Sequence, residues 1–390
     1  MWVTPHWVRR TYRSLRDAID HAQIGLFFAL DTLCFCFRAP TADLAIVMRL
    51  DAIGDFFIWL QSGAVQTTDF CRGEAGHTVL LANQLWADYA RGTGLWDEVI
   101  GIDTDKFCAD PFYRIKTALQ VRGLGAKLLI VPTNSRVFEK DDSLVRVAGA
   151  ARKIGSAGVR HATPALFRAL GRANYSRLIP IDGALKAHET LRNAEFTVLL
   201  TGHPPTPFNL RTLHVVEPAA QMAVAMGAGW SGRVWPIEKL AALIGEILKE
   251  HPGMQVVLLG SAGDRSDADR LAKLIGRPVD DQVGRTSLHQ FVETIGRSRL
   301  VICNESAAYH IAMSLGTKSI CMLGGGHFGR FAPYPASASR DAITRTLSLE
   351  MDCFGCNWVC KFPKERRGPV RCIDDIPVEL AERSAAALLR

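Results

Sequence analysis

The sequence lacks an apolar run long enough to cross a membrane. The nearest approach is residues 24–37, which Asp31 interrupts, whereas a spanning helix needs about 20 apolar residues. A cleaved signal peptide also fits poorly, because Asp31 breaks the apolar region and Arg38 occupies the approach to any cleavage site. We therefore expect an amphipathic helix that is either an interfacial membrane anchor or a helix packed on the first domain.

The chain is also poor in cysteine and in clustered charge. Ten Cys in 390 residues are too few for a disulfide-rich fold. Most of them, such as Cys303 and Cys321 in strand-like runs, resemble the small buried apolar cysteines of proteins in a reducing compartment. The net charge of +7 is modest. Neither of the two basic clusters, Arg9 to Arg16 and Lys361 to Arg371, has the aromatic interleaving or the module signature expected of a nucleic-acid reader. We therefore expect no nucleic-acid partner and favour an anionic membrane surface or an acidic small substrate.

The length of 390 residues predicts two domains. Apolar runs of strand length alternate with helical periodicity from residue 43 onward, which predicts two doubly wound α/β domains facing each other across a cleft. A proline-rich stretch at 201–212 is the most linker-like segment. The expected strands include 44–50, 78–81, 98–102, 127–131, 213–217 and 255–260. The expected domains are a basic and apolar extension (1–42), an N-terminal domain (43–210), a C-terminal domain (211–345) and a Cys-rich tail with a terminal helix (346–390).

The segment 299–326 reads as strand, polar turn, helix and strand in immediate succession. A strand that opens a helix through small and polar residues points free N–H groups beyond the sheet edge, which is an anion site. Glu305 could accept hydrogen bonds from sugar or ribose hydroxyls, Ser306 could donate to a phosphate, and His310 lies one turn later. The alternative is an ordinary N-capped helix with a buried histidine.

Each domain offers one further polar cluster at a strand end. In the first, a strand that ends with Arg49 and Leu50 runs into a turn with Asp51 and Gly54. Asp55 then stands at a helix start, where it would serve either as a catalytic carboxylate or as a cap. In the second, the Gly-rich loop 227–236 contains Arg233, which could bind a phosphate or could simply be solvated.

In combination these motifs resemble glycosyltransferase family 9, the ADP-heptose:lipopolysaccharide heptosyltransferase family. The resemblance covers roughly residues 44–380 and rests on five motifs in the right order. They are Arg49 to Asp55, Ser231 to Pro236, Gly260 at a strand end, Val283 to Leu288, and Asn304-Glu305-Ser306 with His310. It implies a GT-B fold, an inverting and metal-independent transfer that requires no cofactor, an activated sugar on the C-terminal domain and an acceptor on the N-terminal domain.

The resemblance also implies roles for individual residues. Asp55 would be the general base, and Arg49 and Asp51 would lie on the acceptor side. The donor and its phosphates would be bound by Ser231, Arg233, Glu305, Ser306, Ala307, His310 and Gly325. The implied partners are a nucleoside-diphosphate sugar resembling ADP-heptose and a lipid-linked saccharide, met at the inner face of the cytoplasmic membrane. The alternative is a catalytically silent sugar-nucleotide-binding or envelope-assembly protein.

Two departures from the family pattern concern the donor. Arg233 stands where heptosyltransferases usually carry Lys, and Glu305-Ser306-Ala307 replaces Asp-Ser/Thr-Gly. Arginine keeps the positive charge with a different geometry, and glutamate is one methylene longer. The donor sugar is therefore not determined by the resemblance.

Three further patterns have competing explanations. Cys353, Cys356, Cys360 and Cys372 could bind a structural zinc, form a disulfide or remain free thiols, and a regulatory protein centred on them is a third functional alternative. Asp103-Thr104-Asp105 matches a metal-binding D-x-D but falls in the acceptor half, so we expect an ordinary loop. The run 324–329 matches G-x-G-x-x-G without a helix after it, so we expect no dinucleotide fingerprint.

Overall fold

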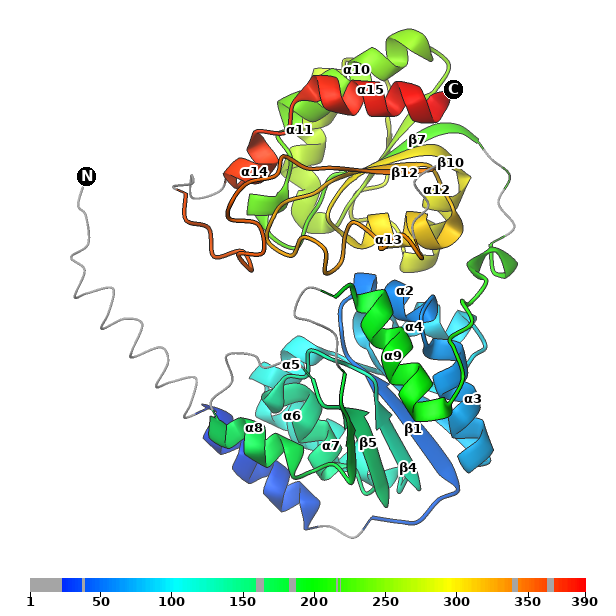
Figure 1. Ribbon diagram of the computed structural model, residues 1–390, viewed down its shortest axis with the longest axis vertical. Coiled ribbons are helices and arrows are strands. Elements are labelled where there is room, and N and C mark those ends of the chain that lie inside the picture. The colour runs from blue at the N-terminus through cyan, green and yellow to red at the C-terminus, as the bar shows by residue number, and fades with distance from the viewer. Residues whose placement is uncertain are drawn as a thin grey trace, which may run out of the picture. The chain divides into compact units, whose positions relative to one another are not determined.

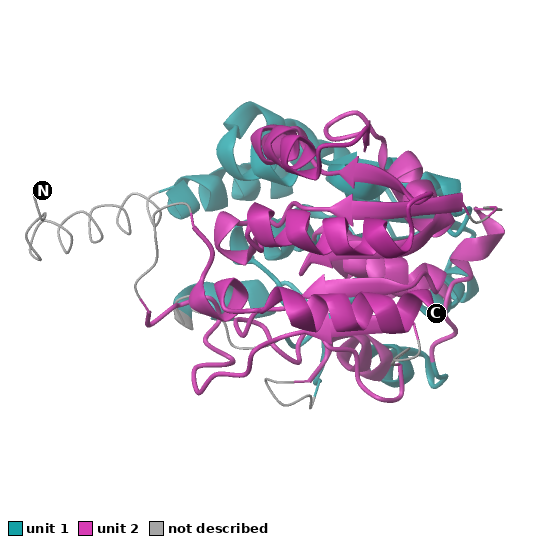
Figure 2. Ribbon diagram, turned by 90° about the horizontal axis from the view of Figure 1, so that it is seen from above, with its two compact units in different colours: residues 1–51, 66–181, 196–204 teal, residues 52–65, 182–195, 205–390 magenta. Residues whose placement is uncertain are grey.

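The structure is a computed structural model of the chain, and it describes residues 23–36, 39–158, 165–181, 187–214, 217, 219–338, 343–362 and 368–390. Within these residues the chain forms two compact units, each assembled from several stretches of sequence (Figure 2). The first unit contains residues 1–51, 66–181 and 196–204, and the second contains 52–65, 182–195 and 205–390. The basic cluster from Arg9 to Arg16 lies outside the described residues.

The first unit is built on a six-stranded parallel sheet of order β3-β2-β1-β4-β5-β6 (Figure 1). Its strands are β1 (Leu44–Arg49), β2 (His77–Asn83), β3 (Glu98–Ile102), β4 (Leu128–Val131), β5 (Arg152–Ser156) and β6 (Arg177–Ile179). Its helices are α3 (Ala64–Glu74), α4 (Gln84–Gly92), α5 (Thr104–Ala109), α6 (Pro111–Gly123), α7 (Ser143–Val147) and α8 (Ala165–Arg172), with a π-helical turn η1 (Phe138–Asp142).

The second unit repeats this arrangement with the order β12-β11-β10-β7-β8-β9. Its strands are β7 (Ala219–Ala225), β8 (Gln255–Leu259), β9 (Asp280–Asp281), β10 (Ser298–Asn304), β11 (Ser319–Met322) and β12 (Thr344–Leu347). Its helices and turns are α2 (Ile53–Leu60), η2 (Leu210–Thr212), η3 (Ser231–Arg233), α10 (Ile237–Glu250), η4 (Ala262–Asp264), α11 (Arg265–Ile275), α12 (Leu288–Arg297), α13 (Ala307–Leu315), α14 (Arg371–Asp374) and α15 (Val378–Leu389). Helix α9 (Glu189–Thr201) is shared between the units.

In each sheet the chain order reverses between two neighbouring strands. The reversal lies between β1 and β4 in the first unit and between β7 and β10 in the second. Open parallel sheets bind ligands beyond the carboxyl ends of the strands at this switch point. The loops that follow β1, β4, β7 and β10 are therefore where a site is expected.

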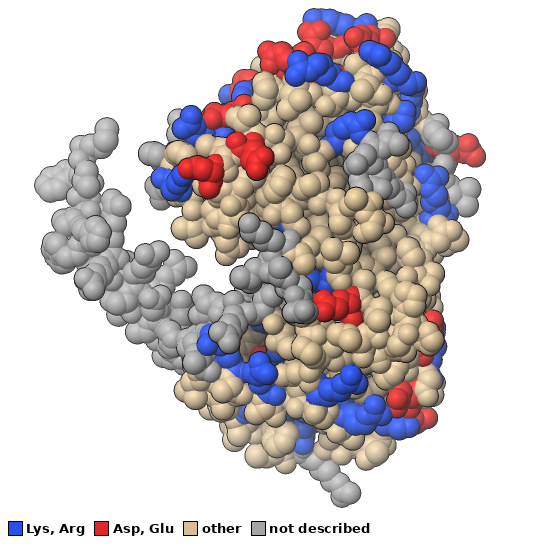
Figure 3. Space-filling view, in the orientation of Figure 1, with Lys and Arg blue, Asp and Glu red and all other residues tan. Residues whose placement is uncertain are grey.

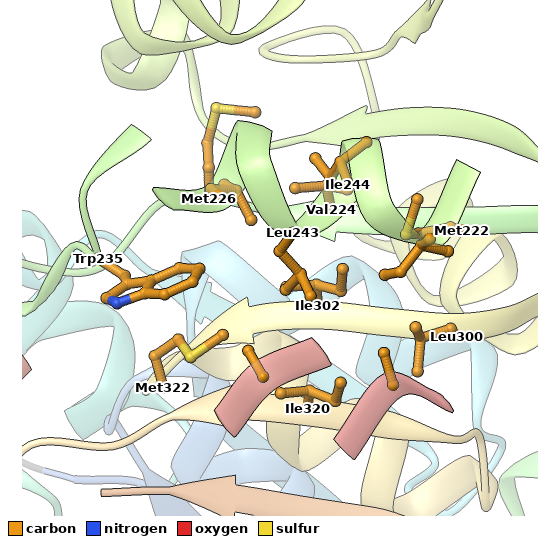
Figure 4. Close-up of a cluster of buried hydrophobic side chains, with 14 of the residues drawn as sticks. Met222, Val224, Met226, Trp235, Leu243, Ile244, Leu300, Ile302, Ile320 and Met322 are labelled. Carbon is orange, nitrogen blue, oxygen red and sulfur yellow. The ribbon is translucent and has the colours of Figure 1, made fainter. Parts of the chain in front are cut away.

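The central strands form because their residues are apolar on both faces. All six residues of β1 are buried, as expected for a parallel strand covered on both sides. In the second unit Met222 and Val224 of β7 and Ile302 of β10 pack with Leu243 and Ile244 of α10 (Figure 4). These rigid strands hold the polar loops at their ends.

One segment from the first half of the sequence packs in the second unit. Residues 52–65, which include α2, belong to this unit, and α2 packs against α13. Phe56 to Leu60 of α2 are fully buried. Asp55 therefore lies in the same unit as Arg233 and Glu305, although 178 residues separate it from Arg233 in the sequence.

The apolar segment near the start forms a helix over residues 23–35 that packs on the first unit. Asp31 is buried, and its carboxylate accepts hydrogen bonds from Nε and Nη2 of Arg114 at 2.9 and 2.7 Å. The Arg114 guanidinium also lies 4.5 Å from the ring of Phe27. Leu26, Leu33 and Phe35 of this helix are exposed. Asp31 thus fixes the helix on the first unit and leaves three large apolar side chains outside.

The predicted fold class, two doubly wound parallel α/β units, is confirmed. The strand expected at 213–217 is wrong: Leu213 lies in a turn, and β7 begins at Ala219. Strands β5 and β6 were not predicted. They are short, and β5 carries Arg, Lys, Gly and Ser around a single Ile, so the apolar run that identifies a buried strand is missing.

Candidate functional site

The loops after β7 and β10 meet at the switch point of the second sheet. Asn304, at the end of β10, is buried and joins the two loops through its side chain. Its Nδ2 donates to the carbonyl of Met226 at 2.6 Å, and its Oδ1 accepts from the N–H of Trp235 at 3.0 Å. The loop with Arg233 is therefore held beside the turn with Glu305 by one side chain.

Arg233 and Glu305 are the charged pair of this site. Nη1 of Arg233 lies 4.0 Å from Oε1 of Glu305, and the glutamate side chain is only 4% exposed. Burial raises the pKa of Glu305 to about 7, against the opposing effect of Arg233. Oε2 of Glu305 is buried and has no hydrogen-bond partner. A buried carboxylate oxygen without a donor is an acceptor available for a ligand hydroxyl.

The turn into α13 presents an unused N-terminus. Ser306 is the N-cap residue of α13, but its hydroxyl makes no capping hydrogen bond. Ala307 begins the helix, and its small side chain leaves the first turn open. The free N–H groups of a helix N-terminus attract an anion.

His310 is buried one turn into α13. Burial, with a contribution from His188, lowers its pKa to about 3, so the imidazole is neutral at physiological pH. Its Nδ1 lies 3.0 Å from the hydroxyl of Tyr334. A neutral imidazole can donate or accept a hydrogen bond, but it adds no positive charge to the site.

Asp55 stands in the first turn of α2, where this helix approaches α13. The N-cap Ala52 has no side-chain cap, and Asp55 is partly exposed. A Cβ placed on the preceding Gly54 would lie 2.9 Å from Cδ2 of His310 and 3.8 Å from Cα of Ala307. Glycine at position 54 therefore allows the first turn of α2 to reach the first turn of α13.

The glycine loop at 324–326 differs from a phosphate cradle. The N–H of Gly325 donates to Sγ of Cys372 at 3.4 Å, and a Cβ on Gly325 would lie 2.1 Å from the ring of Phe354. No helix follows residues 324–329. Gly325 thus lies in the same unit as Arg233 and Glu305, and its backbone N–H is engaged by a cysteine.

Arg49 and Asp51 lie at the switch point of the first sheet. Nε of Arg49 is 3.0 Å from Oδ2 of Asp51, which also accepts from the hydroxyl of Thr133 at 3.3 Å, at the end of β4. Lys140 donates to the carbonyl of Leu50 at 3.3 Å. Asp141 is fully buried in η1, and burial raises its pKa to about 6. Thr133, Lys140 and Asp141 were missed because their sequence context gives no motif.

The remaining acidic motif is structural. Oδ1 of Asp103 accepts the N–H of Lys106 at 3.0 Å and caps α5, and this hydrogen bond lowers the pKa of Asp103. Asp103-Thr104-Asp105 is therefore a helix start rather than a metal loop, as a common N-cap pattern predicts.

The four C-terminal cysteines line one small cavity. Cys353, Cys356, Cys360 and Cys372 surround it together with Gly325 and Trp358. Across the described residues, however, no group of three or more His, Cys, Asp or Glu side chains has a geometry that could hold a metal ion. All four are free thiols here.

The sequence reasoning also missed several residues that pack around Arg233. Trp358 from the cysteine segment and His327 from the glycine loop form a hydrogen bond, and Arg233 lies over the ring of Trp358. Glu189, from α9, binds both Arg192 and Arg330 at 3.1 and 2.9 Å. The one sequence signal for this packing is that Trp, His and Arg residues stand near the glycines of these loops.

The visible surface is mixed in charge. On the face shown in Figure 3, Lys and Arg alternate with Asp and Glu, and large regions carry no charge. Nowhere in the described part of the chain is there a helix with the length and apolar character needed to span a bilayer.

Comparison with known proteins finds a family similarity in the second unit. Residues 206–353 match the model of Glycosyltransferase family 9 (heptosyltransferase). Among solved structures, the ADP-heptose lps heptosyltransferase II of E. coli is similar with a TM-score of 0.61 and 18% identity, over 88% of this chain and 98% of that chain.

Two further solved structures agree. A glycosyl transferase family 9 protein of Veillonella parvula DSM 2008 matches with a TM-score of 0.61 and 16% identity, over 90% of this chain and 99% of that chain. The E. coli heptosyltransferase WaaC with ADP-2-deoxy-2-fluoro heptose matches with a TM-score of 0.57 and 17% identity, over 78% and 92%. No curated protein matches the chain. Residues 206–353 thus match glycosyltransferase family 9 (heptosyltransferase), and the two sheets have the GT-B fold of the solved heptosyltransferases.

Proposed function

We propose that the protein is an inverting glycosyltransferase that moves a sugar from a nucleoside diphosphate to a saccharide acceptor. The observation that carries the proposal is the site at the second switch point, where Arg233, the buried Glu305 and the open N-terminus of α13 lie together. Positive charge, a hydroxyl acceptor and free N–H groups are the chemistry that a diphosphate-linked sugar requires.

On this proposal the donor lies against the loops after β7 and β10. Arg233 and the N-terminus of α13 at Ser306 and Ala307 stabilise the charge that develops on the leaving diphosphate, and Ser231 contacts a phosphate. Glu305 accepts hydrogen bonds from hydroxyls of the sugar or ribose through its unpartnered Oε2. His310, neutral and hydrogen-bonded to Tyr334, orients the diphosphate by donating rather than by charge.

The transfer itself is a single displacement. Asp55 takes the proton of the acceptor hydroxyl, the hydroxyl oxygen attacks the anomeric carbon, and the bond to the diphosphate breaks with inversion. Protein groups stabilise the leaving group, so the proposal assigns no step to a metal. The role of Asp55 as the base is supported by its place on α2, which packs on α13, the helix whose N-terminus is proposed to bind the donor diphosphate.

The acceptor is proposed to bind the first unit at Arg49 and Asp51. We propose a lipid-linked saccharide met at the inner face of the cytoplasmic membrane, as in lipopolysaccharide-type envelope synthesis. The exposed apolar side chains of helix 23–35, Leu26, Leu33 and Phe35, support a peripheral contact with lipid. The arginines at positions 9–16 would add attraction to anionic headgroups.

The cysteines are proposed to act as structural thiols. They line one cavity, where Sγ of Cys372 accepts the N–H of Gly325, and in the described part of the chain they do not form a group that could hold a metal ion. A structural zinc would require the thiolates to move closer together, and zinc content measured on the purified protein distinguishes the two states.

The test of the proposal is donor binding followed by transfer. A panel of nucleotide sugars is screened for thermal stabilisation, because a ligand at 100 times its Kd adds about 2.7 kcal/mol. Arg233→Ala should weaken binding of the selected nucleoside diphosphate by about 1.5–3 kcal/mol, the scale of a hydrogen bond to a charged group. Arg233→Lys is the matched control, since it keeps the charge and should retain most of the affinity.

A second outcome would favour the silent binding protein. If a nucleotide sugar binds and depends on Arg233, but no acceptor is modified and Asp55→Asn has no effect on cell-envelope composition, the site binds without catalysing. Unchanged affinity in Arg233→Ala would instead locate the phosphate site elsewhere.

A further inference from the structure

The cysteine segment 351–360 packs directly on the glycine loop. The N–H groups of Gly355 and Asn357 donate to the carbonyls of Gly325 and Gly326 at 2.7 and 2.9 Å. A Cβ on Gly324 or Gly326 would lie 2.6 or 2.2 Å from the ring of Trp358. The glycines of this loop are therefore required by the approach of an aromatic ring.

Trp358 is fixed in this position by hydrogen bonds and by a neighbouring ring. Its Nε1–H donates to Nδ1 of His327 at 3.2 Å, and Nε2 of His327 lies 2.7 Å from Oδ1 of Asn357. Because an indole N–H can only donate, Nδ1 of His327 accepts this hydrogen bond. Nε2 of His327 therefore carries the hydrogen and donates it in a hydrogen bond to Oδ1 of Asn357. Trp230 packs edge-on against Trp358 with ring centroids 5.9 Å apart.

The ring of Trp358 in turn faces Arg233. The guanidinium carbon of Arg233 lies 5.5 Å from the ring centroid, within the range of a cation–π contact. The only carboxylate with which Arg233 forms an ion pair in the described chain is Glu305, at the long distance of 4.0 Å. The aromatic face is therefore a principal support of the guanidinium.

The backbone at this point is strained. Asn357 and Trp358 have φ angles of 50° and 61°, and they are the only non-glycine residues with positive φ in the described chain. A left-handed conformation is unfavourable for a residue that carries a side chain, and strained residues of this kind concentrate at functional sites. For tryptophan no local side-chain hydrogen bond to its own backbone offsets the cost.

We propose that Trp358 is a positioning residue of the donor site: it holds the guanidinium of Arg233 toward the donor diphosphate. The segment 351–360 is then part of the donor site rather than an appended tail. This inference rests on the proposed function, because it assumes that Arg233 binds the diphosphate.

The test measures binding of ADP, UDP and GDP to the full chain by calorimetry. Trp358→Leu should weaken binding of the preferred nucleotide about three- to thirtyfold, the range of a partly desolvated cation–π contact. Trp358→Phe keeps a ring and should restore most of the affinity. Val359→Ala is the matched control, because Val359 is 78% exposed in the same segment, and it should bind like the wild type.

A double-mutant cycle separates positioning from folding. In an Arg233→Ala background, Trp358→Leu should add little further loss, because the group through which it acts is gone. An equal loss in both backgrounds would overturn the proposal, since Trp358 would then contact the nucleotide itself or only fold the segment.

A measurement without ligand keeps the two proposals apart. The ¹⁵Nε–¹Hε resonance of Arg233 should shift in Trp358→Leu because the ring current is lost, whereas Val359→Ala should leave it in place. If no nucleotide binds the wild type, the proposed function fails, and the resonance still decides whether Trp358 positions Arg233. An unshifted resonance in Trp358→Leu contradicts the positioning role whatever the nucleotide result.

Discussion

Gly54 of α2 lies against His310 of α13, so closely that a Cβ at position 54 would stand 2.9 Å from Cδ2 of the imidazole. His310 is fully buried and hydrogen-bonded to Tyr334, so it has little room to move. This contact places the helix that carries Asp55 on the helix that carries the anion site.

Gly54→Ala should therefore separate the two helices. We expect a loss of about 1–3 kcal/mol in unfolding free energy, the usual cost of overpacking, and a lower turnover because Asp55 shifts with α2. Urea denaturation and initial rates measure both. Gly73→Ala is the control: a Cβ there meets nothing within 4 Å, so it should be neutral or slightly stabilising. Equal behaviour of the two variants would contradict the packing argument.

Asp55→Asn should leave donor affinity unchanged and lower turnover by about 10²-fold or more. The substitution keeps the shape of the side chain but removes the base that accepts the acceptor proton. Nucleotide affinity by calorimetry and single-turnover rates separate binding from chemistry. Wild-type rates in this variant would remove Asp55 from the mechanism.

Glu305 should make stability depend on pH. Its pKa is about 7 in the folded protein and about 4.3 in an unfolded chain. Between these values the folded state binds more protons, so the free energy of unfolding falls as the pH rises through this window and levels off above it. Glu305→Gln cannot ionise and should be more stable than the wild type at pH 8, by about 3–4 kcal/mol, and no more stable at pH 4.

The measurement for Glu305 is urea denaturation of both proteins from pH 4 to pH 8. Glu379→Gln, on the exposed surface of α15, is the matched control and should follow the wild type. A constant difference between Glu305→Gln and the wild type across this range would show that folding does not raise the pKa of Glu305.

The exposed apolar side chains of helix 23–35 should determine lipid binding. Replacing Leu26, Leu33 and Phe35 together by Ser should reduce flotation with vesicles that contain anionic lipid, because apolar area is lost without disturbing the buried pair of Asp31 and Arg114. Leu274→Ser removes a similarly exposed residue of α11, 49% exposed, and should float like the wild type. Unchanged flotation of the triple variant would argue against a lipid contact at this face.

Chelation should leave the initial rate intact. Because Arg233 and the N-terminus of α13 are held by strand–turn–helix units, the leaving group should be stabilised without a divalent ion. Rates are measured directly after EDTA addition, alongside a variant with all four C-terminal cysteines changed to Ser. Immediate loss restored by Mg²⁺ or Mn²⁺ would contradict the mechanism, and slow loss restored only by Zn²⁺ would identify a structural zinc.

Much of the second unit followed from sequence because its signals are local. The run at 298–304 is apolar, Ser306 and Ala307 open a helix, and Gly316 ends it in a left-handed conformation. This alternation of strand and helix predicted Glu305 at a strand end, whereas the strand that precedes Arg233 was expected at 213–217 and lies at Ala219–Ala225. Periodicity and capping act over a few residues, so a single segment contains the information.

Only the tertiary structure decided which segments meet. Nothing near Asp55 in the sequence shows that α2 packs with the second unit, and nothing near Trp358 shows that its ring supports Arg233. Asp31 interrupts the apolar run, and its burial depends on the ion pair with Arg114, which lies 83 residues away in the sequence. The sequence by itself indicated most of the buried strands and several helix starts, but not β5, β6 or the position of β7. Contacts between distant segments depend on packing and on the pairing of buried charges, which no local pattern records.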